Sequence, residues 1–444
     1  MKPFAVSPSP PASTSWGLAE LFIVSQTAIP ALLFLPGTQG MRFYVRVASF
    51  AFSMALLVWW GFGSARNSKG HPAQTWLIVA MIYTAAMVFH PFTSSTLAGL
   101  AQLVLYASVI APLFWAPAVV RSPEHLARLM TLLLICNGVN ACVGVLQVYD
   151  PAHWMPQEMS RIVTESDYGL GAVTYQGPNG LIVRPPGLFD NPGAVAGPGM
   201  YAALLGLVYA TSAATLWKRA LALLGSFAGV AAIYLSQVRV SLVVLVIMLG
   251  TYAGLLMFQQ RKQRAVIFVA VAGGIVVATF TFALTLGGVS IAERTLTLFA
   301  QDPVTLYSAS RGGQLVYTFD DLINSYPLGA GLGRWGMING YFGAGSERPL
   351  WAEIQIAGWA IDGGIPLIVV SVAALAVALL ADRRLALFDA DAKVRACAGV
   401  VLAANIGTAA LIFSFTPFVT QIGLQFWFLA GAVQAIATPR LASR

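Results

Sequence analysis

Charged residues are scarce in this sequence of 444 residues. Asp, Glu, Lys and Arg make up 9% of it, whereas soluble domains carry about 25%. So few charges cannot cover a globular surface, which excludes a cytoplasmic enzyme and a nucleic-acid-binding module. Hydrophobic residues make up 58% and form long unbroken runs, unlike the alternating segments of about ten residues in a membrane β-barrel. The sequence therefore predicts an all-α polytopic membrane protein.

Cysteine and histidine are also few. The three cysteines all lie inside apolar runs: Cys136, Cys142 and Cys397. The four histidines all precede residue 154: His71, His90, His125 and His153. Neither set shows the spacing of a disulfide framework or a metal site. The three cysteines therefore read as small buried hydrophobic residues.

The apolar runs are long enough to cross a membrane, which takes about 20 residues. Twelve candidate spans follow one another along the chain: 18–36, 43–63, 75–92, 96–116, 127–148, 194–216, 220–237, 239–258, 265–288, 354–381, 395–414 and 418–437. Residues 1–17, which include a Ser-Pro-rich stretch, are predicted to be a disordered leader. Residues 438–444 are predicted to be a cytoplasmic tail.

The basic residues predict the orientation. With the N-terminus in the cytoplasm, 16 of the 25 Lys and Arg residues, including every lysine, fall on the cytoplasmic side, as the positive-inside rule requires. The outer side then carries only arginines: Arg42, Arg46, Arg161, Arg184, Arg239, Arg294, Arg311, Arg334 and Arg348. Two long segments, 149–193 and 289–353, also lie outside. They separate spans 1–5 (18–148), 6–9 (194–288) and 10–12 (354–437), so we expect an outward-facing site.

The first outer segment ends in a cluster that suits anion binding. Arg184 begins the stretch Arg-Pro-Pro-Gly-Leu-Phe-Asp-Asn-Pro-Gly, which leads into the sixth span. Pro192 suits the first turn of a helix and Asn191 its N-cap. A helix N-terminus favours anions, so an arginine beside it predicts a phosphate pocket. A capped loop with a solvated arginine is the alternative.

Three further arginines are candidates for the same site. Arg239 lies between the seventh and eighth spans with almost no loop, where a basic residue is costly unless it is functional; snorkelling to the interface is the alternative. Arg311 and Arg334 lie in the second outer segment. Arg334 ends a glycine-rich run that starts at Pro327; no strand precedes this run, so it is not a dinucleotide-binding motif.

Acidic residues near the outer ends of spans are candidates for a general base. Glu353 stands where the second outer segment meets the tenth span, and Asp362 lies deeper, before Gly363-Gly364. Asp190 belongs to the first cluster. Acids in such places either pair with arginine or accept protons. A structural cap is the alternative for Asp362, and a solvated helix end is the expected role of Asp320-Asp321.

The order of these motifs resembles the O-antigen ligase/polymerase superfamily of bacterial inner-membrane glycosyltransferases, which are GT-C-type proteins. The resemblance covers roughly residues 184–370. It rests on the Arg184 to Pro192 stretch, Ser236-x-x-Arg239, Arg311, the Pro327 to Gly333 glycine run, and Glu353 followed by Gly364-Ile365-Pro366. Ligases of this superfamily usually carry a histidine where Glu353 stands, and this departure favours a polymerase over a ligase.

The resemblance implies a reaction and its participants. A glycan is transferred from undecaprenyl diphosphate to a hydroxyl of a glycan or lipid-glycan acceptor, at the periplasmic face of the inner membrane. The diphosphate would be held by Arg184, Arg239, Arg311, Arg334 and Asn191. Glu353 would act as the catalytic base, with Asp190 and Asp362 as competitors. The lipid bilayer is an expected partner, a chain-length regulator is a candidate one, and nucleic acid is not expected. The resemblance also implies that no nucleotide sugar, metal or other cofactor takes part.

Two other functions remain open. One is an O-antigen ligase that transfers the polymer to the lipid A core. The other is a transporter or flippase for lipid-linked oligosaccharides. Transporters carry polar groups at mid-membrane, often at broken helices, whereas the polar content here lies in the two outer segments.

Overall fold

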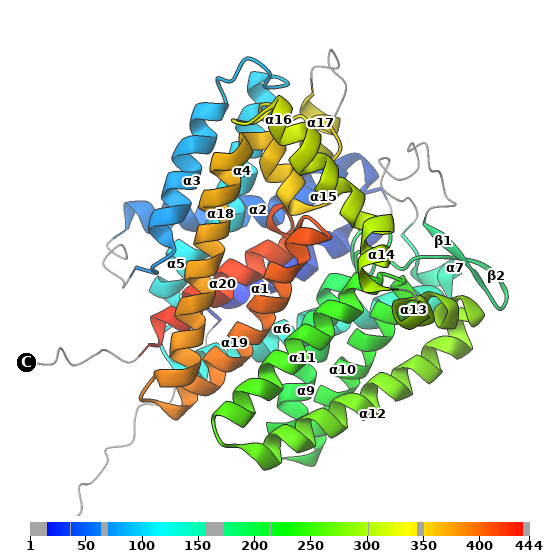
Figure 1. Cartoon of the computed structure of the whole chain (residues 1–444). Coiled ribbons are helices and arrows are strands. Elements are labelled where there is room, and N and C mark those ends of the chain that lie inside the picture. Colours follow the sequence, from blue (N-terminus) through cyan, green and yellow to red (C-terminus); the bar gives the residue numbers. More distant parts are fainter. Residues whose placement is uncertain are drawn as a thin grey trace, which may run out of the picture.

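The structure is a computed structural model of the chain, and it describes residues 16–35, 37–63, 70–156, 173–212, 215–300, 302–343 and 350–437. Nearly all of the predicted leader, the predicted tail, Arg161 and Arg348 lie outside the described residues. Figure 1 shows a bundle of helices in which α18 is the longest.

The first half of the bundle contains α1 (Leu18–Ala31), α2 (Arg42–Phe62), α3 (Gln74–Met87), α4 (Thr96–Ile110), α5 (Pro112–Val119), α6 (Pro123–Tyr149), α7 (Pro151–Trp154), α9 (Ala196–Ser212) and α10 (Leu216–Ser236). The second half contains α11 (Arg239–Phe258), α12 (Lys262–Gly287), α13 (Val289–Ala300), α14 (Pro303–Tyr307), α15 (Gly313–Tyr317), α16 (Ile323–Ser325), α17 (Gly336–Phe342), α18 (Gln355–Phe388), α19 (Ala392–Ala410) and α20 (Gln421–Ala435).

Eight helices among the described residues are long and apolar enough to cross a membrane: Arg42–Phe62, Thr96–Val119, Pro123–Tyr149, Leu216–Ser236, Arg239–Phe258, Lys262–Gly287, Gln355–Phe388 and Ala392–Phe413. Two shorter apolar helical stretches, Leu18–Phe34 and Gln74–Met87, accompany them. These helices indicate a multi-pass membrane protein of the helical class, as the composition predicts. In the core, α9 packs on α10 so closely that a Cβ added to Gly199 would lie 2.8 Å from the Gly229 oxygen.

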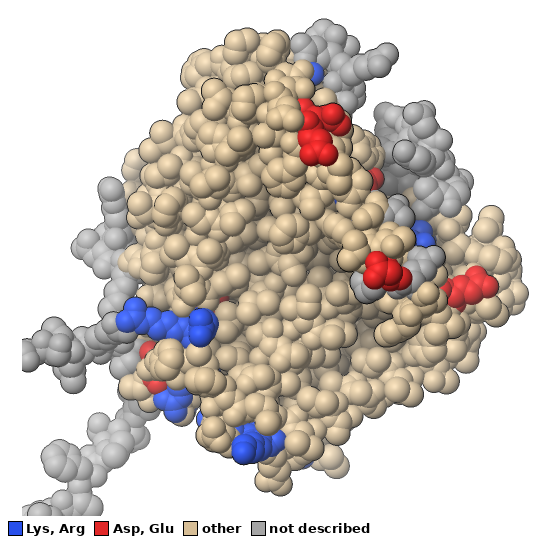
Figure 2. Space-filling view, viewed as in Figure 1, with Lys and Arg blue, Asp and Glu red and all other residues tan. Residues whose placement is uncertain are grey.

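Charged side chains concentrate at the two ends of the bundle. Figure 2 shows a broad area between the charged patches that carries no charged side chain. At one end, Arg128 lies 3.6 Å from Glu20, and Lys393 lies 2.6 Å from Glu124, so the first turns of α1, α6 and α19 meet there. The positive-inside rule assigns this end to the cytoplasm, and we call it the inner end. The outer arginines lie on elements at the opposite end.

The described parts of the two outer segments contain regular secondary structure. The first contains a short antiparallel hairpin of β1 (Thr174–Gly177) and β2 (Gly180–Val183) within an otherwise helical chain. The second is mostly helical rather than a loop: α14, α15 and α16 are joined by two π-turns, Ser308–Gly312 and Thr318–Leu322. Together they form a rod that runs from α13 towards α17 (Figure 1). The rod places residues of the second segment across the outer end.

The glycine-rich run packs against a break in α18. Gly363 and Gly364 have non-helical backbone angles, with φ of +60° at Gly364. The Pro327 oxygen accepts a hydrogen bond from the Ile365 amide (2.9 Å), and the Ala330 amide donates to the Ile361 oxygen (2.7 Å). Backbones approach this closely only where side chains are absent. The glycine-rich run thus packs against α18 and forms backbone hydrogen bonds on both sides of the break.

The first prediction concerns this contact. A Cβ at position 364 would lie 2.1 Å from the Pro327 oxygen, on a backbone with φ in the left-handed region. Gly364→Ala should therefore cost about 2 kcal/mol or more of stability, measured as a fall in the thermal unfolding midpoint in detergent. Gly274→Ala in α12 is the matched control, because nothing lies within 4 Å of its Cβ. An equal midpoint for both variants would contradict the packing role.

Candidate functional site

Three arginines from three separate elements meet at the outer end, and we call them the arginine cluster: Arg184, Arg239 and Arg294. Arg184 directly follows β2, Arg239 is the first residue of α11, and Arg294 lies in α13; all three are half-buried. Burial, and then the charge of Arg239, lower the pKa of Arg184. Burial and the charges of Arg239 and Arg184 lower the pKa of Arg294 to about 10, so it stays charged at neutral pH.

Helix α6 fixes the loop that carries Arg184. The Gln147 side chain donates to the Gly187 oxygen (2.7 Å) and accepts from the Gly187 amide (2.8 Å). Asn140 Oδ1 accepts from the Leu188 amide (3.1 Å). Gly187 has φ of +67°, and a Cβ there would lie 2.0 Å from Asn140 Oδ1. Two buried amide side chains of a span therefore define the path of this loop.

The same loop packs on the junction between α10 and α11. Only Gln237 and Val238 separate the two helices, and Gln237 takes a left-handed conformation with φ of 54°. A Cβ added to Gly193 would lie 3.1 Å from the Val238 side chain. The Gly193 amide also donates to the Arg184 oxygen (3.3 Å). This packing places Arg184 close enough to Arg239 for the charge of Arg239 to act on it.

Helix α13 contributes the third arginine. Thr297, one turn after Arg294 on the same helix, accepts a hydrogen bond from Arg239 Nη1 (2.8 Å). The hairpin holds the start of α13, because the Ser290 hydroxyl donates to the Gln176 oxygen (2.5 Å). Sequence motifs assign no role to Arg294. The available signal is the spacing of three between Arg294 and Thr297, which places both on one side of an amphipathic helix.

Some hydrogen-bond donors of the arginine cluster have no partner among the described residues. Among the described residues, the Nε atoms of Arg184 and Arg294 and the Tyr175 hydroxyl are buried without a hydrogen-bond partner, and no carboxylate forms an ion pair with the cluster. Burial raises the pKa of Tyr175, so its hydroxyl keeps its proton. Half-buried like charges repel one another and favour a bound anion. Planar guanidinium forks suit phosphate oxygens, so the cluster can hold a multiply charged anion such as a diphosphate.

Asp190, a predicted catalytic residue, is held by two other arginines. Arg46 contacts both of its oxygens, at 3.2 Å from Nε and 2.6 Å from Nη2, and Arg42 Nε lies 3.0 Å from Oδ2. The Asp190 side chain is buried. Arg46 also reaches the Met337 sulfur in α17 (3.8 Å). Asp190 thus connects the first outer segment to α2, next to α17. Both oxygens of its carboxylate contact arginines, so its role is to hold the structure in position.

Glu353 and Arg311 form an ion pair with each other. Arg311 lies in the π-turn Ser308–Gly312, and both side chains are about one-third exposed (39% and 33%). Gln314 fixes the backbone around the acid, since its Oε1 accepts from the amides of Glu353 (2.8 Å) and Ile354 (3.0 Å). The structure therefore offers a carboxylate that is oriented, accessible and next to a cation. The sequence expects Arg311 beside Arg184 and Arg239, whereas its ion pair among the described residues is with Glu353.

The structure places two other predicted residues differently. Helix α9 begins at Ala196, so Asn191 is not its N-cap; the Asn191 oxygen accepts from the Ala194 amide in a turn before the helix. Arg334 is buried in the glycine-rich run, where it donates to the Ala330 oxygen (3.3 Å). Its charge acts on His90, whose pKa burial and Arg334 lower together. Neither residue has a contact with the arginine cluster among the interactions described.

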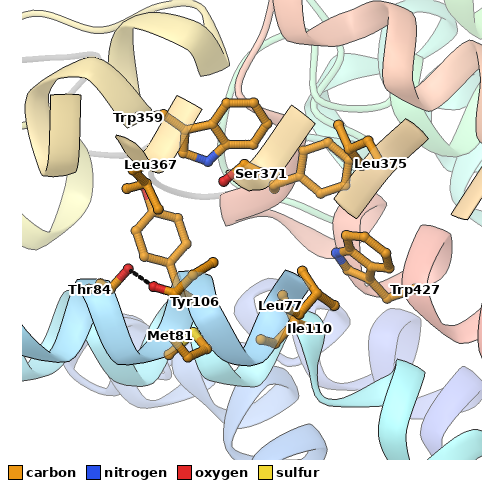
Figure 3. A pocket seen from close by; sticks show the side chains of 12 residues that line it. Leu77, Met81, Thr84, Tyr106, Ile110, Trp359, Leu367, Ser371, Leu375 and Trp427 are labelled. Carbon is orange, nitrogen blue, oxygen red and sulfur yellow. Dashed lines mark hydrogen bonds between the residues drawn. The ribbon is translucent and has the colours of Figure 1, made fainter. Parts of the chain in front are cut away.

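Asp362 lies at the break in α18 and is fully buried. Its Oδ2 accepts from Tyr106 (2.6 Å), Trp335 (3.0 Å) and Gln102 (3.2 Å). Tyr106 also lines a crevice between α3, α4, α18 and α20, whose volume is about 40 Å³. Figure 3 shows Tyr106 and Trp359 among the side chains around it. The crevice is small and lined mainly by apolar side chains. It therefore favours a structural role for Asp362 at the break in α18 over a catalytic one.

No protein-family model matches this chain, and no curated protein sequence does. The fold and the site therefore define its class: a multi-pass helical membrane protein with an arginine cluster at one end. Within the described residues, no group of three or more His, Cys, Asp or Glu side chains is placed to hold a metal ion.

The second prediction tests the cluster as an anion site. Arg294→Gln removes one of three mutually repelling charges, so the unliganded protein should gain stability, on the order of 1 kcal/mol. Inorganic pyrophosphate should raise the unfolding midpoint of the wild type and have little effect on Arg294→Gln. Thermal unfolding in detergent measures both. Arg121→Gln, an exposed arginine at the inner end, controls for net charge. A pyrophosphate response retained by Arg294→Gln would argue against the site.

Proposed function

We propose that this protein is a bacterial inner-membrane glycosyltransferase of the O-antigen ligase/polymerase type. It extends undecaprenyl-diphosphate-linked repeat units into a polysaccharide at the periplasmic face. The observation that carries the proposal is the arginine cluster, in which three half-buried guanidinium groups converge with no carboxylate partner among the described residues. The proposal also includes the twelve membrane spans predicted from the sequence, in a GT-C-like arrangement.

The depth of the cluster suits a lipid-linked donor. Arg239 begins a candidate span, so its side chain lies near the level of lipid headgroups, where a polyprenyl diphosphate is anchored. Helix α13 exposes Val289 (71%), Leu296 (57%) and Phe299 (83%) on one side and carries Arg294 on another. An amphipathic helix of this kind lies in a membrane interface with its apolar side in lipid. The diphosphate would then sit beneath α13 while the polyprenyl chain stays in the bilayer.

Glu353 is the proposed general base. The acceptor hydroxyl oxygen attacks the anomeric carbon of the donor glycan, and its proton passes to the Glu353 carboxylate. The bond from that carbon to the diphosphate oxygen breaks, and its electron pair leaves with undecaprenyl diphosphate, whose charge the arginine cluster stabilises. Arg311 orients the carboxylate through their ion pair. Asp190 is less suited to the role, because Arg42 and Arg46 already occupy its oxygens.

The third prediction tests the base. Glu353→Gln keeps the size of the side chain and removes its basicity, so the rate of polymer formation should fall about 10²–10⁴-fold. The measurement is polymer length and yield with purified protein and lipid-linked repeat units. Glu293→Gln, an exposed acid one residue before Arg294, is the matched control and should leave the rate unchanged.

Asp190→Asn separates catalysis from positioning. It leaves Arg42 and Arg46 without their buried partner, so its loss of activity should come with a lower unfolding midpoint, unlike Glu353→Gln. Near-normal polymer from Glu353→Gln, with loss in Asp190→Asn or Asp362→Asn at unchanged stability, would move the role of base to that residue.

A transporter for lipid-linked sugars is the second candidate, and a specific observation favours it. Helix α18 is broken at Gly363-Gly364 beside the buried Asp362, and transporters often place substrate or ion sites at broken helices. The same reconstituted vesicles distinguish the two. A glycosyltransferase lengthens the glycan, whereas a transporter moves it between leaflets at unchanged length.

A further inference from the structure

A cavity of about 180 Å³ lies at the inner end, opposite the arginine cluster. Its walls are mainly apolar and come from α6, α9, α11 and α19: Met130, Leu205, Val208, Leu256 and Val400. Arg261, which precedes α12, and Arg264, in the first turn of α12, line it as well. The cavity thus combines an apolar interior with two guanidinium groups.

The two arginines are available to a ligand. Arg261 is half-buried and Arg264 is exposed, and neither forms an ion pair with a carboxylate of the described residues. The nearby acids at the start of α6 and α19 are engaged elsewhere. Glu124 accepts from Lys393 Nζ (2.6 Å), and Asp391 accepts from the Lys393 amide (2.7 Å) as the cap of α19. The positive charge at this cavity is therefore not neutralised by its surroundings.

We propose that the cavity binds an anionic phospholipid of the inner leaflet. Its phosphate would contact Arg261 and Arg264, and the first part of an acyl chain would cover the apolar walls. Basic pockets between spans on the cytoplasmic side commonly hold acidic headgroups. The volume is below the roughly 300–1,000 Å³ of pockets that enclose a whole small molecule, which fits a headgroup whose tails remain in the bilayer. Free phosphate would contact the same arginines and leave the apolar walls unfilled.

The test compares probes on the purified full chain in neutral detergent. Phosphatidylglycerol, phosphatidylcholine or inorganic phosphate is titrated while the thermal unfolding midpoint is followed. We expect phosphatidylglycerol alone to raise the midpoint. Arg261→Gln and Arg264→Gln should each weaken its apparent affinity about five-fold, the factor expected for one charge near a membrane surface. Lys262→Gln removes an exposed charge from the same turn without lining the cavity, so it should behave as wild type.

A second variant tests the apolar walls without changing the charge. Ala396→Phe places a ring in the cavity and keeps both arginines, so it should abolish the response to phosphatidylglycerol. An equal rise with inorganic phosphate would overturn the lipid assignment. The site itself would be overturned if Lys262→Gln and Arg261→Gln weakened the affinity for phosphatidylglycerol equally. It would also be overturned if the two phospholipids raised the unfolding midpoint equally. This proposal is independent of the glycosyltransferase proposal, since its residues lie at the other end of the bundle.

Discussion

Repulsion among three half-buried guanidinium groups is the constraint on which the outer end of this protein depends. Arg184, Arg239 and Arg294 have no carboxylate partner among the described residues, so the surrounding backbone must hold them together. Several features serve this purpose at once. Buried amide side chains of α6 fix the loop after β2, α10 and α11 are joined by two residues, and the hairpin rests on the start of α13. Three half-buried charges held together in this way are the basis of the proposal that this end of the protein binds an anion.

Three other outer arginines, Arg42, Arg46 and Arg311, are paired with carboxylates. Arg42 and Arg46 hold Asp190, and Arg311 holds Glu353. These pairs differ in exposure. Asp190 is buried and tied to α2, whereas Glu353 is about one-third exposed and framed by Gln314. The charged groups of the outer end thus fall into three kinds. Arg42, Arg46 and Asp190 hold elements together, the arginine cluster has no carboxylate partner among the described residues, and Glu353 is accessible enough to accept a proton.

The sequence predicts the class of the fold and part of the site. Long apolar runs and scarce charge identify the helices, and the arginine-only outer side contains every member of the arginine cluster. Local patterns could not show which arginines are paired, because the partners lie far apart in the chain: Arg46 and Asp190 are separated by 144 residues. They also misplaced Asn191, since Pro192 suits a helix start but α9 begins at Ala196. The role of Arg294 depends on how α13 folds back on α11, which no short motif encodes.

The most direct test of the central claim is an experimental structure of the protein with undecaprenyl diphosphate bound. The account predicts that diphosphate oxygens lie within hydrogen-bonding distance, about 3 Å, of the guanidinium groups of Arg184, Arg239 and Arg294. The polyprenyl chain should leave past α13 into the bilayer. A diphosphate bound elsewhere, with the three arginines contacting only protein or solvent, would contradict the account.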